Sequence, residues 1–335
     1  MVRYLIASVV AALLLGPDSV RSVASAQTPT TIALPAQSLL FAPIYIAQER
    51  GLFTKHGIEP KIIYAAGPAV VPALIGKSAD FTSISGAIHL AAAARNQMLL
   101  GIANTQDKIT TDIVVRADVA KKLNFPANAD FAAKMKALKG LTIGVDAVNG
   151  LPHSVIRFLA VKAGMNPETD FTITALQPPA MLAALKAGTI DAMAFSPPFS
   201  LLAVSEGGVP WIVGPTVNLP EFKSFPYNVI LVRPDYCDAN KDRCQGFVNA
   251  LRDAIALMKA DPAQSLQSLS KTFDKMDPAV LKASYEVFAE FQQQDLKLTT
   301  EMLQNGISFG KIGGIVPADA KLDEAKLYSP AFAPK

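Results

Sequence analysis

The residues best suited to hold a small ligand are polar and follow short apolar stretches of the chain. The clearest run is Asn149-Gly150-Leu151-Pro152-His153. Glycine lets the backbone approach a ligand closely, and backbone N–H groups at the start of a helix favour anions. His153 and Arg157 lie one helical turn apart, and an arginine fork can hold an anion. The run therefore predicts an anion site, with a solvated helix face as the alternative for these two side chains.

Other polar residues occupy equivalent places, each beside the end of an expected strand. Ligands of parallel sheets bind outside the carboxyl ends of the strands, so these positions are candidate contacts. A Ser or Asn there can instead cap the next helix, and the two roles can coexist. The expected ligand-binding residues are Ser38, Leu39, Ser85, Gly86, Asn104, Asn149, Gly150, His153, Gln177, Ser196 and Tyr227.

Aromatic side chains can line the same site. Most helical aromatic residues belong to a core, so core packing is the alternative for each of them. Tyr227 is the strongest candidate, because it directly precedes a strand that we expect at the back of the cleft. The five candidates are Phe41, Tyr45, Phe195, Phe199 and Tyr227.

Several kinds of chemistry have no support in the sequence. The chain has three His, with no cluster of His, Cys and carboxylates at metal-binding spacing. There is no Ser-His-Asp order and no phosphate-binding G-x-x-x-x-G-K motif. The net charge is only +3, without a basic cluster between aromatic residues. We therefore expect no catalytic residue, no metal, no cofactor and no nucleic-acid partner.

The chain has two cysteines, Cys237 and Cys244. In an exported protein they predict a disulfide, with a redox-active pair as the alternative, although the spacing is not C-x-x-C. Residues seven apart on one helix are separated by about 10.5 Å of rise, whereas a disulfide needs Cα atoms within about 7 Å. Residues 238–243 are therefore expected to form a loop or turn, with a helix beginning after it.

The elements that must position these residues repeat along the chain. The phrase from Leu74 to Ser85 recurs from Leu185 to Ser196, at a constant offset of 111 residues. Each copy is typical of a helix end, a turn, and a short strand opened by Asp and closed by Ser. The repeat predicts two similar lobes, with Ser85 and Ser196 facing each other across a cleft, and clefts between domains bind small ligands.

Strands and helices alternate in both halves of the chain. Strands are expected at 30–36, 58–65, 80–84, 99–103, 141–146, 171–176, 191–195 and 211–213. This βαβαβαβ order predicts mostly parallel sheets flanked by helices. The last hundred residues are expected to be helical and to pack on the first lobe.

Two further phrases, 112–118 and 229–235, are strands that end in Arg-x-Asp. They predict a double hinge, with ordinary core strands as the alternative. The expected division is 27–115 with 230–335 for lobe I, and 116–229 for lobe II.

The first 26 residues have the pattern of a secretory signal peptide. Arg3 precedes an apolar stretch, and Ala24-Ser25-Ala26 is an A-x-A cleavage site. The alternative, a membrane anchor, needs about 20 apolar residues, and this stretch is shorter. We expect cleavage near Ala26 and a periplasmic protein.

The run from Phe41 to Pro60 contains Ala47-x-x-x-Gly51-x-Phe53-x-x-x-Gly57. With Asp80-Phe81, Asp191-Ala192 and Ser196-Pro197-Pro198, it resembles the sulfonate/nitrate/taurine-type (NMT1/THI5-like) substrate-binding proteins of ABC transporters. The resemblance implies a two-lobed α/β periplasmic-binding-protein type II fold, joined by two hinge strands. It also implies a monomer that captures a small ligand and delivers it to an ABC permease at the inner membrane. A small anion, either sulfonate-like or an organic or aromatic acid, is the expected ligand.

Two other functions are also compatible with the sequence. One is an enzyme of the same fold, such as a thiamine-pyrimidine synthase, although that relative has a clustered-cysteine motif that this chain lacks. The other is a ligand-sensing subunit of a membrane receptor.

Overall fold

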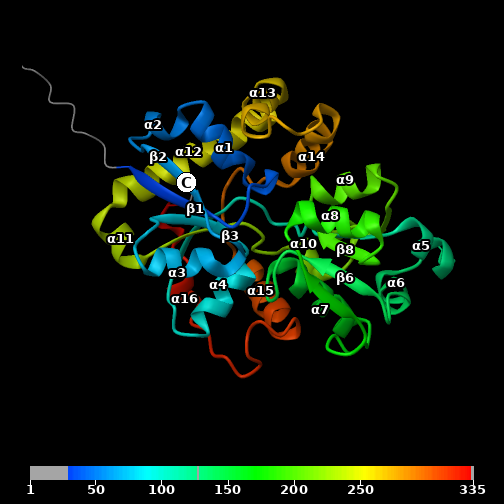
Figure 1. The fold of residues 1–335 in the computed structure, drawn as a ribbon. Coiled ribbons are helices and arrows are strands. Elements are labelled where there is room, and N and C mark those ends of the chain that lie inside the picture. Colours follow the sequence, from blue (N-terminus) through cyan, green and yellow to red (C-terminus); the bar gives the residue numbers. More distant parts are fainter. Residues whose placement is uncertain (1–28, 127, 333–335) are drawn as a thin grey trace, which may run out of the picture.

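Two mixed sheets organise the molecule, one in each lobe (Figure 1). The computed structural model describes residues 29–126 and 128–332, so the expected signal peptide lies outside the described residues. In spatial order, the sheet of lobe I contains β2 (Pro60–Tyr64), β1 (Thr30–Leu34), β3 (Phe81–Ile84), β10 (Val229–Val232) and β4 (Leu100–Asn104). The sheet of lobe II contains β7 (Thr172–Ala175), β6 (Thr142–Val145), β8 (Ala192–Phe195), β5 (Asp112–Val115) and β9 (Val209–Ile212).

One strand in each sheet runs against its neighbours, and in both sheets it is the first strand after a crossing between the lobes. β10 is antiparallel to β3 and β4, while β5 is antiparallel to β8 and β9. The other paired strands are parallel where they touch directly, so the expectation of mostly parallel sheets is confirmed. The chain crosses between the sheets twice, at 105–111 and 213–228.

The boundary expected at residue 115 is wrong for one strand. β5 was expected to belong with lobe I, but its register places Asp112 opposite Phe195 of β8. The first crossing therefore ends before Asp112. We propose a division in which lobe I comprises 29–104 and 229–332, lobe II comprises 112–212, and the crossing segments join them.

Helices cover both faces of each sheet (Figure 1). In lobe I, before the first crossing, they are α1 (Ala42–Glu49), α2 (Leu52–Lys55), α3 (Val70–Ile75) and α4 (Gly86–Ala93), with the short 3-10 helices η1 (Leu39–Phe41) and η2 (Gly67–Ala69). In lobe II they are α5 (Ala117–Leu123), α6 (Phe131–Ala137), α7 (Leu151–Lys162), α8 (Pro178–Ala187) and α9 (Phe199–Ser205). The second crossing contains η3 (Gly214–Thr216) and α10 (Pro220–Lys223).

The last hundred residues are helical, as expected. Their elements are α11 (Pro234–Ala239), α12 (Lys241–Ala260), α13 (Pro262–Thr272), α14 (Pro278–Phe291), α15 (Thr300–Ile312), α16 (Glu324–Leu327) and η4 (Pro330–Phe332). α12 packs on lobe I, where Phe247 stacks on Phe81 of β3 at 4.2 Å between ring centroids. α15 packs on α4 of lobe I, as expected, and it also reaches lobe II, where Phe309 stacks on Phe158 of α7 at 4.8 Å. Within the described ranges, no helix is both long and apolar enough to cross a membrane.

The repeated phrase makes the same hydrogen bonds in both lobes. The Asp80 carboxylate accepts from the N–H of Thr31 at 2.9 Å, and Asp191 accepts from the N–H of Thr142 at 3.0 Å. These pairs keep the offset of 111 residues, so the opening Asp ties the repeated strand to its parallel neighbour, β1 in lobe I and β6 in lobe II. The sequence repeat is therefore also a structural repeat.

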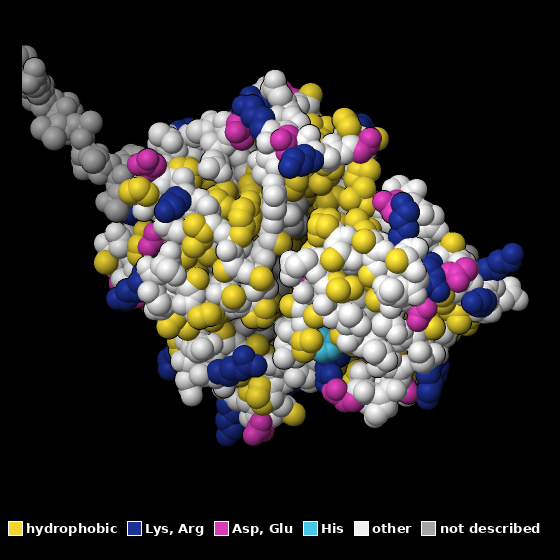
Figure 2. Space-filling view, in the orientation of Figure 1, with side chains coloured by type: hydrophobic (Ala, Val, Ile, Leu, Met, Phe, Trp, Pro, Cys, Tyr) yellow, Lys and Arg dark blue, Asp and Glu magenta, His cyan; other side chains and the backbone are white. Residues whose placement is uncertain are grey.

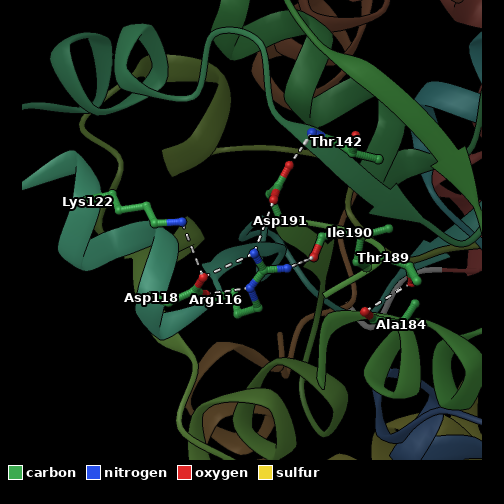
Figure 3. A network of polar contacts seen from close by, with 8 residues as sticks. All are labelled: Arg116, Asp118, Lys122, Thr142, Ala184, Thr189, Ile190 and Asp191. Carbon is green, nitrogen blue, oxygen red and sulfur yellow. Dashed lines mark hydrogen bonds and ion pairs between the residues drawn. The ribbon is translucent and has the colours of Figure 1, made fainter. Parts of the chain in front are cut away.

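The Arg-x-Asp phrase holds the antiparallel strand of each sheet, β5 or β10, in place. The Arg116 guanidinium donates to the carbonyl of Ile190 at 3.1 Å and lies 3.5 Å from Asp191, a network that Figure 3 shows. Arg233 makes the equivalent bond in lobe I, to the carbonyl of Ala79 at 2.8 Å. Each arginine thus binds the turn of the repeated phrase beside its own strand. Both phrases belong to sheet strands, and the crossing segments lie outside them.

The expected disulfide forms between Cys237 and Cys244, with Cα atoms 5.8 Å apart. The predicted loop at 238–243 is wrong in extent, because α11 continues to Ala239 and α12 begins at Lys241. A single residue, Asn240, breaks the helical path with φ −135° and ψ 49°. One such break is enough to bring the two sulfurs together.

Removing this disulfide is expected to lower the free energy of unfolding by about 2 kcal/mol, because the bridge restricts the unfolded chain. The double variant Cys237→Ala/Cys244→Ala, compared with wild type by urea denaturation, measures the loss. A reductant should destabilise the wild type but not the variant. Equal midpoints for the oxidised wild type and the variant would contradict a stabilising role.

Candidate functional site

A pocket lies between the two lobes, at the ends of strands from both sheets. Pro35 follows β1, Ser85 follows β3, Asp146 follows β6 and Ser196 follows β8. The pocket and the open space at its mouth enclose about 630 Å³. Figure 2 shows the narrow groove between the two halves of the molecule, bordered mainly by uncharged side chains.

Hydroxyl groups form one polar side of the pocket. Ser196 Oγ lies 2.7 Å from the Tyr227 hydroxyl, and Thr110 Oγ1 donates to that hydroxyl at 3.0 Å. Thr111 Oγ1 lies 3.4 Å from both Ser196 Oγ and the Tyr227 hydroxyl. Burial raises the pKa of Tyr227, so it stays a neutral hydrogen-bonding group at ordinary pH. The cluster joins both crossing segments to the end of β8.

Apolar groups form most of the remaining surface. Phe41 comes from η1 in lobe I and Phe195 from β8 in lobe II, and both are buried. Ile84 and Ile88 line the pocket from lobe I, while Leu151 does so from the start of α7. Aromatic and aliphatic walls of this kind favour a ligand with an apolar body.

Three serines or glycines at helix starts border the pocket. Ser85 is the N-cap of α4 and its Oγ accepts from the N–H of Ala87 at 3.2 Å. Ser38 caps η1 in the same way, accepting from Leu40. Gly150 is the N-cap of α7, where no side chain caps the first turn. For Ser38 and Ser85 the capping alternative is therefore realised in a position that also lines the pocket.

Asp146 carries the single carboxylate among the described pocket residues, and no Lys, Arg or His of that part of the chain lines the pocket. Its Oδ1 atom is buried and has no hydrogen-bond partner among the described residues. Burial raises the pKa of the Asp146 carboxyl to about 6, although the N–H of Ala147 partly offsets this. The charge of the pocket is thus opposite to the one that an anion site requires.

The structure brings together five of the predicted binding residues in this pocket: Ser38, Ser85, Gly150, Ser196 and Tyr227. The others do not line it. Leu39 is fully buried in the core of lobe I, while its neighbour Leu40 faces the pocket. Gln177 is exposed at the start of α8. Gly86 packs against Pro226, whose carbonyl accepts from the Gly86 N–H at 2.7 Å.

Asn104, the last residue of β4, bonds to both crossing segments and does not line the pocket. Its amide nitrogen donates to the carbonyl of Gln106 at 2.9 Å, and its oxygen accepts from the N–H of Asn228 at 3.3 Å. Asn228 in turn donates to Thr105 Oγ1 at 2.9 Å and accepts from Ser83 Oγ at 2.7 Å. Buried amide groups thus fasten the two crossing segments to each other behind the pocket.

The predicted anion clamp on α7 does not form. Asn149 has φ +61° and faces an outer groove, and its N–H donates to His153 Nδ1 at 3.0 Å. Burial and the nearby charge of Arg157 lower the pKa of His153. Arg157 donates to the carbonyl of Gly313 at 2.7 Å and pairs with Glu168 at 2.5 Å. Both side chains are mostly buried, so the solvated-face alternative is wrong as well.

Among the five aromatic candidates, Phe41, Phe195 and Tyr227 line the pocket. Tyr45 is a core residue, with its hydroxyl 3.4 Å from that of Tyr64 and its ring against Phe273. Phe199 packs on Phe195 from outside the pocket. Over the described ranges, no group of three or more His, Cys, Asp or Glu residues is placed to hold a metal ion.

Two lobes, each with one antiparallel strand in an otherwise parallel sheet, and a pocket between them define the periplasmic-binding-protein fold. The structure of the alkanesulfonate-binding protein SsuA from Xanthomonas axonopodis pv. citri, bound to MOPS, has this fold. The TM-score is 0.70 at 19% sequence identity, over 90% of this chain and 98% of that one. This chain belongs to the NMT1-like family, whose family model matches residues 35–270.

Two curated relatives are proteins of different kinds, one named for transport and the other an enzyme. The bicarbonate transport ATP-binding protein CmpC of Synechocystis sp. is 26% identical over 235 residues, which are 68% of this chain and 34% of CmpC. The chain therefore spans about a third of the length of that relative. The 4-amino-5-hydroxymethyl-2-methylpyrimidine phosphate synthase of Aspergillus parasiticus is 23% identical over 301 residues, 86% of this chain and 83% of the synthase.

Proposed function

We propose that this protein is a periplasmic solute-binding protein that captures one small molecule between its lobes and delivers it to an ABC permease at the inner membrane. The observation that carries the proposal is the pocket, because Ser85 of lobe I and Ser196 of lobe II both line it. Closure of two lobes on a solute excludes water and changes the outer surface that a permease contacts. An N-terminal signal peptide cleaved near Ala26 and a monomeric state complete the proposal.

The small anion that the sequence favours fits this pocket poorly. The similarity to an alkanesulfonate-binding protein supports solute binding in general. At 19% identity, however, it does not extend to the ligand. The described lining residues offer one carboxylate and no cationic side chain. The class of solute is therefore proposed separately below.

An enzyme of the same fold is the second candidate, because the relative from Aspergillus parasiticus is a synthase. The cysteines of this chain are joined in a disulfide, so they provide no clustered thiols for such chemistry. A receptor subunit would bind a solute in the same pocket but would not support its uptake. These alternatives differ in what happens to the solute after it binds.

A thermal-shift screen of the mature protein against small polar, anionic and cationic solutes tests the proposal. A bound solute should raise the melting temperature in a concentration-dependent way and be recovered unchanged. Recovery of a chemically altered solute would favour the enzyme. Binding without uptake of the solute by cells that express this protein would favour the receptor subunit.

Replacing Ser196 by alanine is expected to weaken binding of the stabilising solute about tenfold, because one polar contact is worth roughly 1.4 kcal/mol. Thr216→Ala is the matched control. Thr216 also follows a strand of lobe II, but it is exposed and lies outside the pocket. Titration calorimetry gives both affinities. Equal affinities for the two variants would place the site elsewhere.

A further inference from the structure

The ionised side chain of Asp146 is expected to lower the stability of the ligand-free fold. Asp146 directly follows β6 and lines a pocket whose other described walls are apolar or uncharged. Its Oδ1 atom is buried without a partner among the described residues. A carboxylate in such surroundings loses hydration, which the hydrogen bond from the N–H of Ala147 only partly replaces. No ion pair or hydrogen bond within the described residues satisfies the Oδ1 atom.

The carboxylate also occupies the place where an external anion would bind. No side chain caps the start of α7, and such a helix start attracts negative charge. A Cβ atom on Gly150, the N-cap of α7, would lie 3.2 Å from Asp146 Oδ1. The protein therefore supplies its own anion at this helix start. A sulfonate or nitrate in the pocket would face a like charge.

The side chains around Asp146 suit an organic cation. Phe41, Phe195 and Tyr227 line the same pocket, and aromatic faces attract cations when water is excluded. The hydroxyls of Ser196 and Tyr227 can accept hydrogen bonds from N–H groups. Two basic side chains lie in the first two turns of α7, and both have other partners. His153 accepts from the N–H of Asn149, and Arg157 is paired with Glu168. Neither forms an ion pair or a hydrogen bond with Asp146.

We propose that the pocket takes a small organic cation, with an apolar or planar body against the aromatic walls and a protonated nitrogen paired with Asp146. This inference rests on the proposed solute-binding function and names its class of ligand. A protonated amine or amidine has the required chemistry, because it donates charged hydrogen bonds to the carboxylate. The paired cation would replace the hydration that Asp146 loses on burial.

Benzamidine and benzoate test the charge preference directly, because the two probes have the same planar shape and opposite charges. Benzamidine should raise the melting temperature of the wild type at millimolar concentration, whereas benzoate should not. Asp146→Asn should weaken benzamidine binding at least tenfold. Glu206→Gln, which removes a half-exposed carboxylate of lobe II outside this pocket, should leave the affinity unchanged.

The outcomes separate the ligand class from the binding function. A larger shift with benzoate, nitrate or methanesulfonate would overturn the cation proposal and leave solute binding intact. Equal benzamidine affinity in wild type and Asp146→Asn would also overturn it. If neither planar probe binds, the cation proposal fails, and the wider solute screen then decides the proposed function independently.

Discussion

Replacing Asn228 by alanine is expected to lower the free energy of unfolding by about 3 kcal/mol. The side chain is buried, and it joins three parts of the fold. Its oxygen accepts from Ser83 Oγ at 2.7 Å, and its nitrogen donates to Thr105 Oγ1 at 2.9 Å and to the carbonyl of Leu40 at 3.2 Å. Alanine would remove all three bonds, and each buried polar group that loses its partner costs about 1–3 kcal/mol.

Urea denaturation of the mature protein measures this loss. Asn166→Ala is the matched control, because Asn166 is exposed and its side chain makes a local turn contact with the N–H of Glu168. The control should change the free energy of unfolding by less than about 1 kcal/mol. If both variants unfold at the same urea concentration, the buried amide network does not fasten the crossing segments.

Replacing Asp146 by asparagine is expected to stabilise the ligand-free protein by about 3 kcal/mol at pH 7.5. Burial raises the pKa of this carboxyl to about 6, from an ordinary value of 3.8. The folded state therefore binds the proton more tightly than the unfolded state does. Wild type loses stability as the pH rises from about 4 to above 6, and the uncharged asparagine does not. The gain of the variant should vanish near pH 4.

The comparison isolates Asp146 because other buried titrating groups are unchanged in the variant. Burial raises the pKa of Asp112 to about 6 and lowers that of His89 to about 4. His153 and Arg157 lie on α7, where both side chains have other partners. Thermal unfolding at pH 4.5 and 7.5 gives the difference between variant and wild type. A difference that does not grow with pH would show that the ionised carboxylate carries no cost.

Much of the fold could be predicted from the repeat, because the residues that define each copy are neighbours in the sequence. The Asp that opens each repeated strand and the small-residue turn before it can be read from neighbouring residues. The pairing of β5 with β8 cannot, since it joins Asp112 to Phe195 across most of lobe II. The boundary at residue 115 was wrong for this reason. The extent of the turn between Cys237 and Cys244 was also wrong, because one residue, Asn240, suffices to redirect the chain.

The strand-end rule found part of the pocket and failed where the crossing segments cover a strand. Ser85 and Ser196 reach the pocket, whereas Gly86 is covered by Pro226 and Asn104 by Asn228. Asp146 was missed although it is the last residue of an expected strand. An anion site is expected to contain amides and basic side chains, so that expectation assigns no role to a carboxylate. A charged residue at a strand end beside Asn149-Gly150 was the signal that could have found it.

The central claim is that a small solute binds between the lobes. A crystal structure of the mature protein with the solute that stabilises it most in the thermal-shift screen tests this claim most directly. Electron density for the solute is expected between Phe41 and Phe195, with polar contacts to Ser196 and Asp146. Density for the solute at any other place, with this pocket filled only by water, would contradict the account.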